Sequence, residues 1–151
     1  MTKPCEILLV EDDPHDVELT LTALRENHLA NEICVVRDGA EALDYLYRHG
    51  DYGSRETGNP AVVLLDLKLP KVDGLEVLKR VKGDPDLKTV PVVVLASSRE
   101  ERDLAESYNL RTNAYVVKPV GFSDFVEAVR ELGLFWAVIN QPPPRSVGQT
   151  R

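Results

Sequence analysis

Short, continuously apolar runs are the feature that most constrains how this chain folds. Three of them read ILLV, VVLL and VVVL, without polar residues at alternate positions. A strand with one face in water alternates apolar and polar residues, so an unbroken apolar run indicates a strand covered on both faces. Each run is followed by a turn and by a segment with helical periodicity. This alternation predicts an α/β fold in which a parallel sheet, joined by right-handed crossovers, lies between helices.

Five strand-helix units are expected along the chain. The predicted strands are Cys5 to Val10, Glu32 to Arg37, Ala61 to Asp66, Val92 to Ala96 and Ala114 to Val117. The predicted helices begin at Pro14, capped by Asp13, at about Ala40 (to His49), at about Leu75 (to Lys82), at Ser98 and near Ser123. The fourth helix offers little for burial beyond Leu104, Ala105 and Tyr108, so we expect it to be the most weakly held.

The length of 151 residues accommodates one folded domain. We expect this domain to cover residues 1–140. The segment 141–151 contains three consecutive prolines followed by mostly polar residues, which predicts an extended or disordered arm. Too few residues follow the fifth helix for a DNA-binding module, so no attached output domain is expected.

Charge and hydropathy exclude several classes of partner. The net charge is −7, which opposes binding to phosphate backbones and to anionic lipids. The longest apolar run, LFWAVI, is far shorter than the roughly 18 to 20 residues of a membrane-spanning helix. The N-terminal stretch turns acidic where a signal peptide would have small residues. We therefore expect a cytoplasmic protein that binds neither nucleic acid nor membrane.

The two cysteines, Cys5 and Cys34, lie in apolar stretches and lack the spacing of a metal site. We expect them to be buried free thiols.

Carboxylates gather where the predicted strands end. The carboxyl ends of parallel strands meet at one edge of an open sheet, which is where such folds place their functional crevice. The residues expected there are Glu11, Asp12 and Asp13 after the first strand, Asp66 at the end of the third, Ala96, Ser97 and Ser98 at the end of the fourth, and Lys118 after the fifth. Oxygen ligands without His or Cys suit Mg²⁺. A rigidly held Asp66 beside Mg²⁺ and Lys118 can attack phosphorus and form an aspartyl phosphate.

Three of these residues also have simpler structural explanations. Asp13 before Pro14 can be a helix cap and nothing more. Lys118 can be a solvated lysine at a strand end. Ser98, three residues before Glu101, has the spacing of a capping box.

Four segments together resemble the receiver domain of two-component response regulators, the CheY-like family. They are VEDD at 10–13, LLDLKLPKVDG at 64–74, VPVVVLASS at 90–98 and AYVVKP at 114–119. The resemblance extends over about residues 6–139. It implies a doubly wound, flavodoxin-like (βα)5 fold with strand order 2-1-3-4-5. It also implies a signalling phosphoacceptor rather than an enzyme with an external substrate.

The same resemblance implies roles for individual residues. Asp66 is the phosphoacceptor, Asp12 and Asp66 bind Mg²⁺ directly, Glu11 helps through water, and the main-chain carbonyl of Lys68 completes the metal ligands. Lys118 pairs with the phosphoryl group, and the Lys118-Pro119 peptide bond is cis. The phosphate donor is a sensor histidine kinase.

One position departs from the family pattern. Where the family has Thr or Ser at the end of the fourth strand, this chain has Ala96, which cannot donate a hydrogen bond to a phosphoryl oxygen. Tyr115 matches the aromatic residue of the switch. Either the switch is weakened, or Ser97 binds the phosphoryl group after a small shift of the backbone. Lys68 and Ser98 are not the pair that positions attacking water in CheY, so a slower decay of the aspartyl phosphate is expected.

A narrower resemblance is to the small response regulators encoded beside phytochrome histidine kinases. It rests on the polar connection from Arg48 to Asn59, on the segment 98–119 and on the late Phe135-Trp136 pair. It implies a phytochrome-type kinase as partner and a homodimer formed through the C-terminal helices and arm. Leu134 and Val138, on the helix face opposite the core, and Phe135 are the dimer candidates.

Two other classes share parts of this pattern. A phosphatase of the haloacid-dehalogenase type has an aspartate nucleophile beside Mg²⁺, but it needs a second acid two residues later, where this chain has Lys68. A flavodoxin-like cofactor carrier needs a phosphate loop after the first strand, whereas Glu11, Asp12 and Asp13 repel phosphate. The sequence therefore favours a response regulator, with the phosphatase as the alternative.

Overall fold

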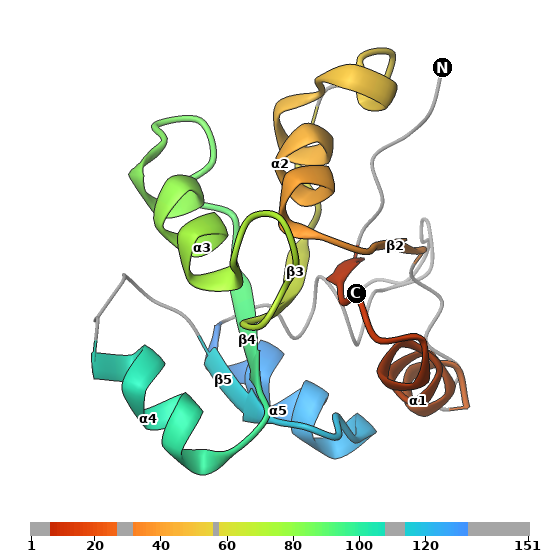
Figure 1. Cartoon of the computed structure of the whole chain (residues 1–151). Helices are drawn as coiled ribbons and strands as arrows, with labels where there is room; N and C mark the ends of the chain where they lie inside the picture. The colour runs from red at the N-terminus through yellow and green to blue at the C-terminus, as the bar shows by residue number, and fades with distance from the viewer. Residues whose placement is uncertain (1–6, 27–31, 56–57, 108–113, 133–151) are drawn as a thin grey trace, which may run out of the picture.

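The computed structural model describes residues 7–26, 32–55, 58–107 and 114–132. Within them, five parallel strands form one sheet in the order β2-β1-β3-β4-β5 (Figure 1). The strands are β1 (Ile7–Val10), β2 (Ile33–Val36), β3 (Val62–Asp66), β4 (Val92–Ala96) and β5 (Ala114–Val117). Every residue of β1, β3 and β4 is buried, which confirms that the continuous apolar runs are strands covered on both faces.

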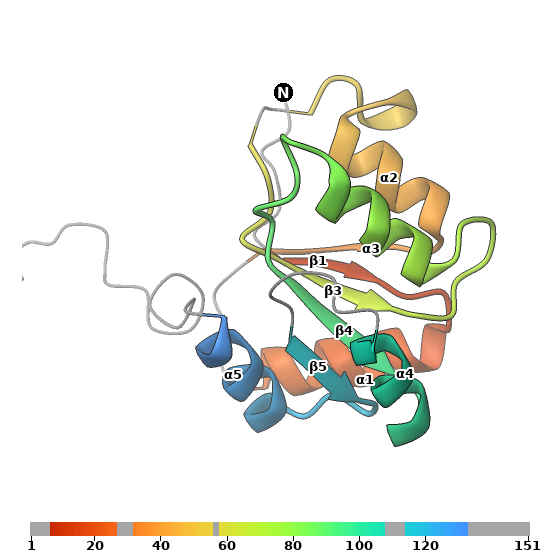
Figure 2. The same ribbon diagram turned by 90° about the vertical axis from the view of Figure 1, so that its left-hand side faces the viewer.

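Helices cover both faces of this sheet. They are α1 (Pro14–Arg25), α2 (Gly39–Tyr47), α3 (Gly74–Gly83), α4 (Arg99–Ser107) and α5 (Phe122–Glu131), with a short 3-10 turn, η1 (Gly50–Tyr52), after α2. α2 and α3 pack on one face, and α1 and α5 pack on the other (Figure 2). No helix in the described ranges is long and apolar enough to cross a membrane.

The first helix starts at its expected cap. The carboxylate of Asp13 accepts a hydrogen bond from the His15 amide at 2.8 Å, and Pro14 occupies the first helical position. Apolar burial by the fourth helix is sparse, as predicted: Ala105 is the buried residue of α4 within the described range. Leu104 was expected to be buried too but is 61% exposed, and Tyr108 lies outside the described residues. The third predicted strand starts one residue late, at Val62.

One expectation about the cysteines is wrong. Cys34 is disulfide-bonded, and the described residues include no free cysteine. Cys34 lies in β2 beside Leu8 of β1, which places it against the strand that follows Cys5 in the chain. Cys5 itself lies outside the described residues. The spacing of cysteines along the chain indicates metal sites, whereas the pairing of strands decides which segments meet.

Candidate functional site

The strand ends bring three charged side chains together at one edge of the sheet. Glu11 follows β1, Asp66 ends β3 and Lys118 follows β5. The ammonium Nζ of Lys118 lies 3.1 Å from Oε1 of Glu11 and 3.4 Å from Oδ2 of Asp66. Both carboxylates are almost fully buried. The backbone at Lys118 is held in place by its amide, which donates to the carbonyl of Ala96 at 2.7 Å. The Lys118-Pro119 peptide bond is cis, as expected.

Glu11, Asp12 and Asp66 form a compact set of oxygen ligands. One carboxylate oxygen from each lies within 4.8 Å of the other two. Asp12 is exposed, whereas Glu11 and Asp66 are buried, so the set opens to solvent on one side. Three carboxylates without nitrogen or sulfur donors are typical of a site for a hard divalent cation. The structure thus brings together the acidic residues that the sequence predicts.

The burial of these acids changes their protonation. Burial and, to a smaller extent, the neighbouring Asp66 raise the pKa of Glu11 to about 7, against the lowering effect of Lys118. Burial also raises the pKa of Asp66, although contacts with Glu11 and Lys118 oppose the increase. Burial acts to lower the pKa of Lys118, but Asp16, Asp66 and Glu11 outweigh it and leave that pKa above its ordinary value. A divalent cation placed among the acids would relieve their repulsion, so the residues fit such an ion.

Asp16 belongs to this cluster although the sequence analysis did not identify it. Its Oδ2 lies 2.9 Å from Lys118 Nζ, closer than the oxygens of Glu11 or Asp66. Asp16 is the third residue of α1, which begins directly above the carboxyl end of β1. Its position in the first turn after the Asp13 cap is the signal that could have revealed it.

The loop after β3 is held tightly against the sheet. The Lys68 amide lies 3.5 Å from Oδ1 of Asp66, and the Gly74 amide donates to the Leu67 carbonyl at 2.9 Å. A Cβ atom added at Gly74 would overlap the carbonyl oxygen of Asp66 and lie 2.6 Å from the Cα of Leu67. Glycine at this position therefore allows α3 to begin in contact with the backbone of the phosphoacceptor candidate.

The end of β4 differs in part from the expected capping box. Oγ of Ser98 accepts from the Glu101 amide at 3.1 Å, as expected, but the Glu101 carboxylate accepts from the Ser97 amide at 2.6 Å rather than from Ser98. The Ser97 side chain is exposed and Ala96 is fully buried.

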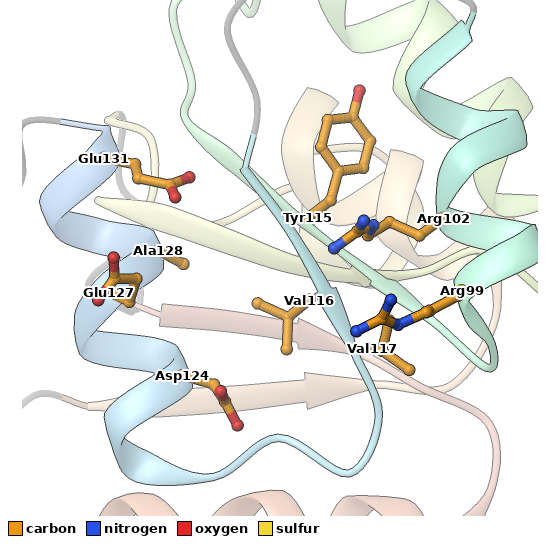
Figure 3. Close-up of a pocket in the computed structure, with 9 residues that line it drawn as sticks. All are labelled: Arg99, Arg102, Tyr115, Val116, Val117, Asp124, Glu127, Ala128 and Glu131. Atoms are coloured by element: carbon orange, nitrogen blue, oxygen red, sulfur yellow. The ribbon is translucent and has the colours of Figure 1, made fainter.

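A hollow lies over β5, between α4 and α5. It has a volume of about 290 Å³ and is lined by Arg99, Arg102, Tyr115, Val116, Val117, Asp124, Glu127, Ala128 and Glu131. Figure 3 shows the two arginines on the α4 side and the three acids on the α5 side. Tyr115, the switch candidate, is half-buried and packs against the core. The dimer candidates Leu134, Phe135 and Val138 lie outside the described residues.

Comparison with known proteins agrees with this geometry. Residues 7–130 match the model of the response regulator receiver domain. Response regulator Rcp1 of Synechocystis sp. is 41% identical over 133 residues, covering 88% of this chain and 89% of that protein. The bacteriophytochrome response regulator AtBRR is 62% identical and superposes with a TM-score of 0.85, over 93% of this chain and 99% of AtBRR. The Mn²⁺-bound form of Rcp1 is 37% identical, with a TM-score of 0.69 over 97% of this chain and all of Rcp1.

Proposed function

The chain belongs to the response regulator receiver family, and on that premise we propose that Asp66 accepts a phosphoryl group from the phosphohistidine of a sensor kinase. Receivers of this family signal in two-component systems, bind a divalent metal through acidic residues and receive phosphate from histidine kinases. The observation that supports the assignment to Asp66 is its position: a nearly buried carboxylate, 3.4 Å from an ammonium and grouped with two further acids.

The chemistry assigned to this site is a phosphoryl transfer. A carboxylate oxygen of Asp66 forms a bond to phosphorus while the bond between phosphorus and the imidazole nitrogen breaks, and the electron pair returns to the imidazole. Lys118 is placed to neutralise charge on the transferring oxygens. Glu11 and Asp16 hold the Lys118 ammonium at the site. The protein thus acts as a phosphoacceptor rather than as an enzyme with an external substrate.

We assign Mg²⁺ as the ion of the site, with Asp12 and Asp66 as direct ligands, Glu11 through water, and the main-chain carbonyl of Lys68 as a further ligand. When bound, this ion supplies positive charge beside the reacting oxygens. The existence of a Mn²⁺-bound form of the relative Rcp1 supports a divalent ion as the cofactor.

Mass spectrometry after incubation with Mg²⁺ and acetyl phosphate tests this function. We expect one added phosphoryl group in the natural chain and none in Asp66→Asn. Asp73→Asn is the matched control, because Asp73 is an exposed acid of the adjoining loop without a side-chain cap bond. Persistence of the adduct in Asp66→Asn would overturn the assignment. Turnover of varied phosphate esters would favour the phosphatase instead.

A phytochrome-type histidine kinase is the proposed donor, since AtBRR is described as a bacteriophytochrome response regulator. Phosphotransfer from a purified bacteriophytochrome kinase, compared with an unrelated histidine kinase, tests this choice. We expect faster transfer from the bacteriophytochrome, and equal rates would contradict it. The transfer needs a kinase charged by ATP, so the proposal includes a cytoplasmic location.

The proposal also includes a homodimer formed through the C-terminal helices and the arm at 141–151, which follows a receiver domain at 1–140. The hollow over β5 supports self-association by its charge pattern, because it carries Arg99 and Arg102 on the α4 side and three acids on the α5 side, and a second copy offers charges of both signs to it. Light scattering of the intact chain and of Leu134→Asp tests the helical contact. Equal monomeric masses for both would remove the dimer.

A further inference from the structure

The Glu101 carboxylate connects two loops that border Asp66. One oxygen, Oε1, accepts a hydrogen bond of 2.6 Å from the backbone amide of Ser97. The other, Oε2, lies 3.6 Å from the ammonium of Lys68. The Glu101 side chain is 15% exposed, whereas Lys68 is 76% exposed, so the carboxylate is the fixed member of the ion pair.

Helix capping does not require this geometry. In a capping box the third helical residue returns its carboxylate to the amide of the cap residue itself, which here is Ser98. Ser98 already caps the helix through its Oγ atom. Glu101 instead extends one residue further back, to the first residue after β4. Its contacts therefore fix the position of the loop relative to β3 in addition to stabilising α4.

Both partners of Glu101 flank the phosphoacceptor. β4 pairs directly with β3, with Leu95 opposite Asp66, and Ser97 comes two residues later. Lys68 follows Asp66 by two residues, and its amide faces Oδ1 of Asp66. A phosphoryl group on Asp66 adds negative charge and oxygen acceptors at this point. The Ser97 amide and the Lys68 ammonium, on the residues that follow these two strand ends, are donors that Glu101 engages in the unphosphorylated protein.

α4 is attached to the rest of the domain by little apolar burial, so the loss of the Glu101 contacts would affect its position. Ala105 is its buried residue, and the exposed Leu104 borders a hollow of about 220 Å³ next to Leu67 and Lys68. With so little apolar burial, the contacts of Glu101 are a large share of what fixes the first turn of α4.

We propose that Glu101 is a positioning residue that holds the loop between β4 and α4 in its unphosphorylated arrangement and releases its two donors when Asp66 is phosphorylated. This inference rests on the proposed function of Asp66. It accounts for a switch in a chain where Ala96 supplies no hydroxyl group at the end of β4. The loop moves because the phosphoryl group attracts the donors and repels the Glu101 carboxylate.

Beryllofluoride binding in the presence of Mg²⁺, measured by calorimetry, tests the release. In Glu101→Ala the donors are already free, so we expect beryllofluoride to bind about three- to tenfold more tightly, the effect of one net hydrogen bond. Glu101→Gln keeps an acceptor for the Ser97 amide but loses the charge, and an intermediate affinity is expected. Glu100→Ala is the matched control, because Glu100 is an exposed acid of the same turn. It should bind as the natural chain does.

Hydrogen exchange of the metal-free protein gives a second, independent measurement. We expect amides 97–105 to exchange faster in Glu101→Ala by a similar factor and to remain unchanged in Glu100→Ala. A merely structural role predicts the opposite sign for binding, since a loosened loop would bind beryllofluoride more weakly. Weaker or unchanged affinity in both Glu101 variants overturns the proposal. If Glu101→Ala does not fold, Glu101→Gln decides alone. Failure of the natural chain to bind beryllofluoride or accept phosphate would instead refute the function of Asp66.

Discussion

The ammonium of Lys118 lies 3.4 Å from Oδ2 of Asp66, at a point where the aspartate is nearly excluded from solvent. The same ammonium contacts Glu11 and Asp16, so one cation serves three carboxylates. Such a cluster has an excess of negative charge that a proton or a metal ion can offset. This imbalance is what makes the site responsive to pH, to divalent ions and to a phosphoryl group.

Replacing Lys118 with Met should damage both stability and reactivity. The substitution leaves the buried Glu11 and Asp66 without their cation, and breaking a buried ion pair from one side costs about 3 kcal/mol. We also expect phosphorylation by acetyl phosphate to slow about 100-fold, the usual effect of losing one charge-stabilising donor. Denaturant titration and mass spectrometry measure the two effects. Lys88→Met, at an exposed lysine, is the control, and equal behaviour of the two variants would argue against the role of Lys118.

The stability of the metal-free protein should fall as the pH rises from about 4.5 to 7. Glu11 has an ordinary pKa of 4.5 and a folded-state pKa of about 7. Between these values the folded state binds more protons than the unfolded state, so raising the pH favours unfolding. Proton binding by Glu11 thus adds about 1–3 kcal/mol to the free energy of unfolding. This stabilisation is fully present below pH 4.5 and is lost as the pH rises through about 7. Urea titrations of the natural chain and of Glu11→Gln measure it. If the free energy of unfolding depends on pH in the same way in Glu11→Gln, groups other than Glu11 cause the effect.

Mg²⁺ should raise the melting temperature and release a proton near pH 6. The ion binds the ionised acids, so it must displace the proton that Glu11 holds at this pH. Asp12→Asn should lose most of the stabilisation, because Asp12 belongs to the ligand set. Asp51→Asn, at an exposed acid far along the chain, should keep it. Calorimetry in buffers of different ionisation enthalpy counts the protons released. An equal thermal shift in both variants would contradict the assigned site.

The sequence allowed the sheet and most of the site to be predicted, for an identifiable reason. Strands buried on both faces leave a continuous apolar signal, and parallel pairing brings their polar carboxyl ends together, so Glu11, Asp12, Asp66 and Lys118 follow from order alone. Asp16 was missed because its role depends on where α1 begins relative to β1. Side-chain direction decides such contacts, and it is set by packing rather than by spacing.

The contacts of Glu101 and the disulfide at Cys34 also could not be predicted from spacing along the sequence. The spacing of Ser98 and Glu101 indicated a capping box, but it could not show that the carboxylate extends to Ser97 and Lys68. The spacing of the two cysteines likewise could not show that Cys34 is disulfide-bonded. Spacing along the chain does not reveal contacts that tertiary structure makes.

Ala96→Ser should restore a hydroxyl group at the end of β4. Ala96 is completely buried, so the new group costs about 1 kcal/mol in the unphosphorylated protein if it finds no partner. We expect tighter beryllofluoride binding, because the hydroxyl can donate to the phosphoryl analogue. Ala105→Ser introduces the same group at a buried alanine of α4 and should destabilise without improving binding. Identical affinities for the two variants would place Ala96 outside the switch.

Gly74→Ala should be far more damaging than Gly83→Ala, although both glycines lie at the ends of α3. A methyl group at Gly74 overlaps the backbone carbonyl of Asp66, and rigid backbone cannot move aside as a flexible side chain can. We expect a loss of about 3 kcal/mol or more and slower phosphorylation, because relief of the overlap displaces Asp66. At Gly83 an added Cβ meets no atom within 4 Å, so alanine should be neutral or stabilise by up to about 1 kcal/mol. Denaturant titrations and acetyl phosphate kinetics compare the pair. Similar stability of the two variants would show that α3 does not begin against Asp66, and normal phosphorylation in Gly74→Ala would show that its contact does not position the carboxylate.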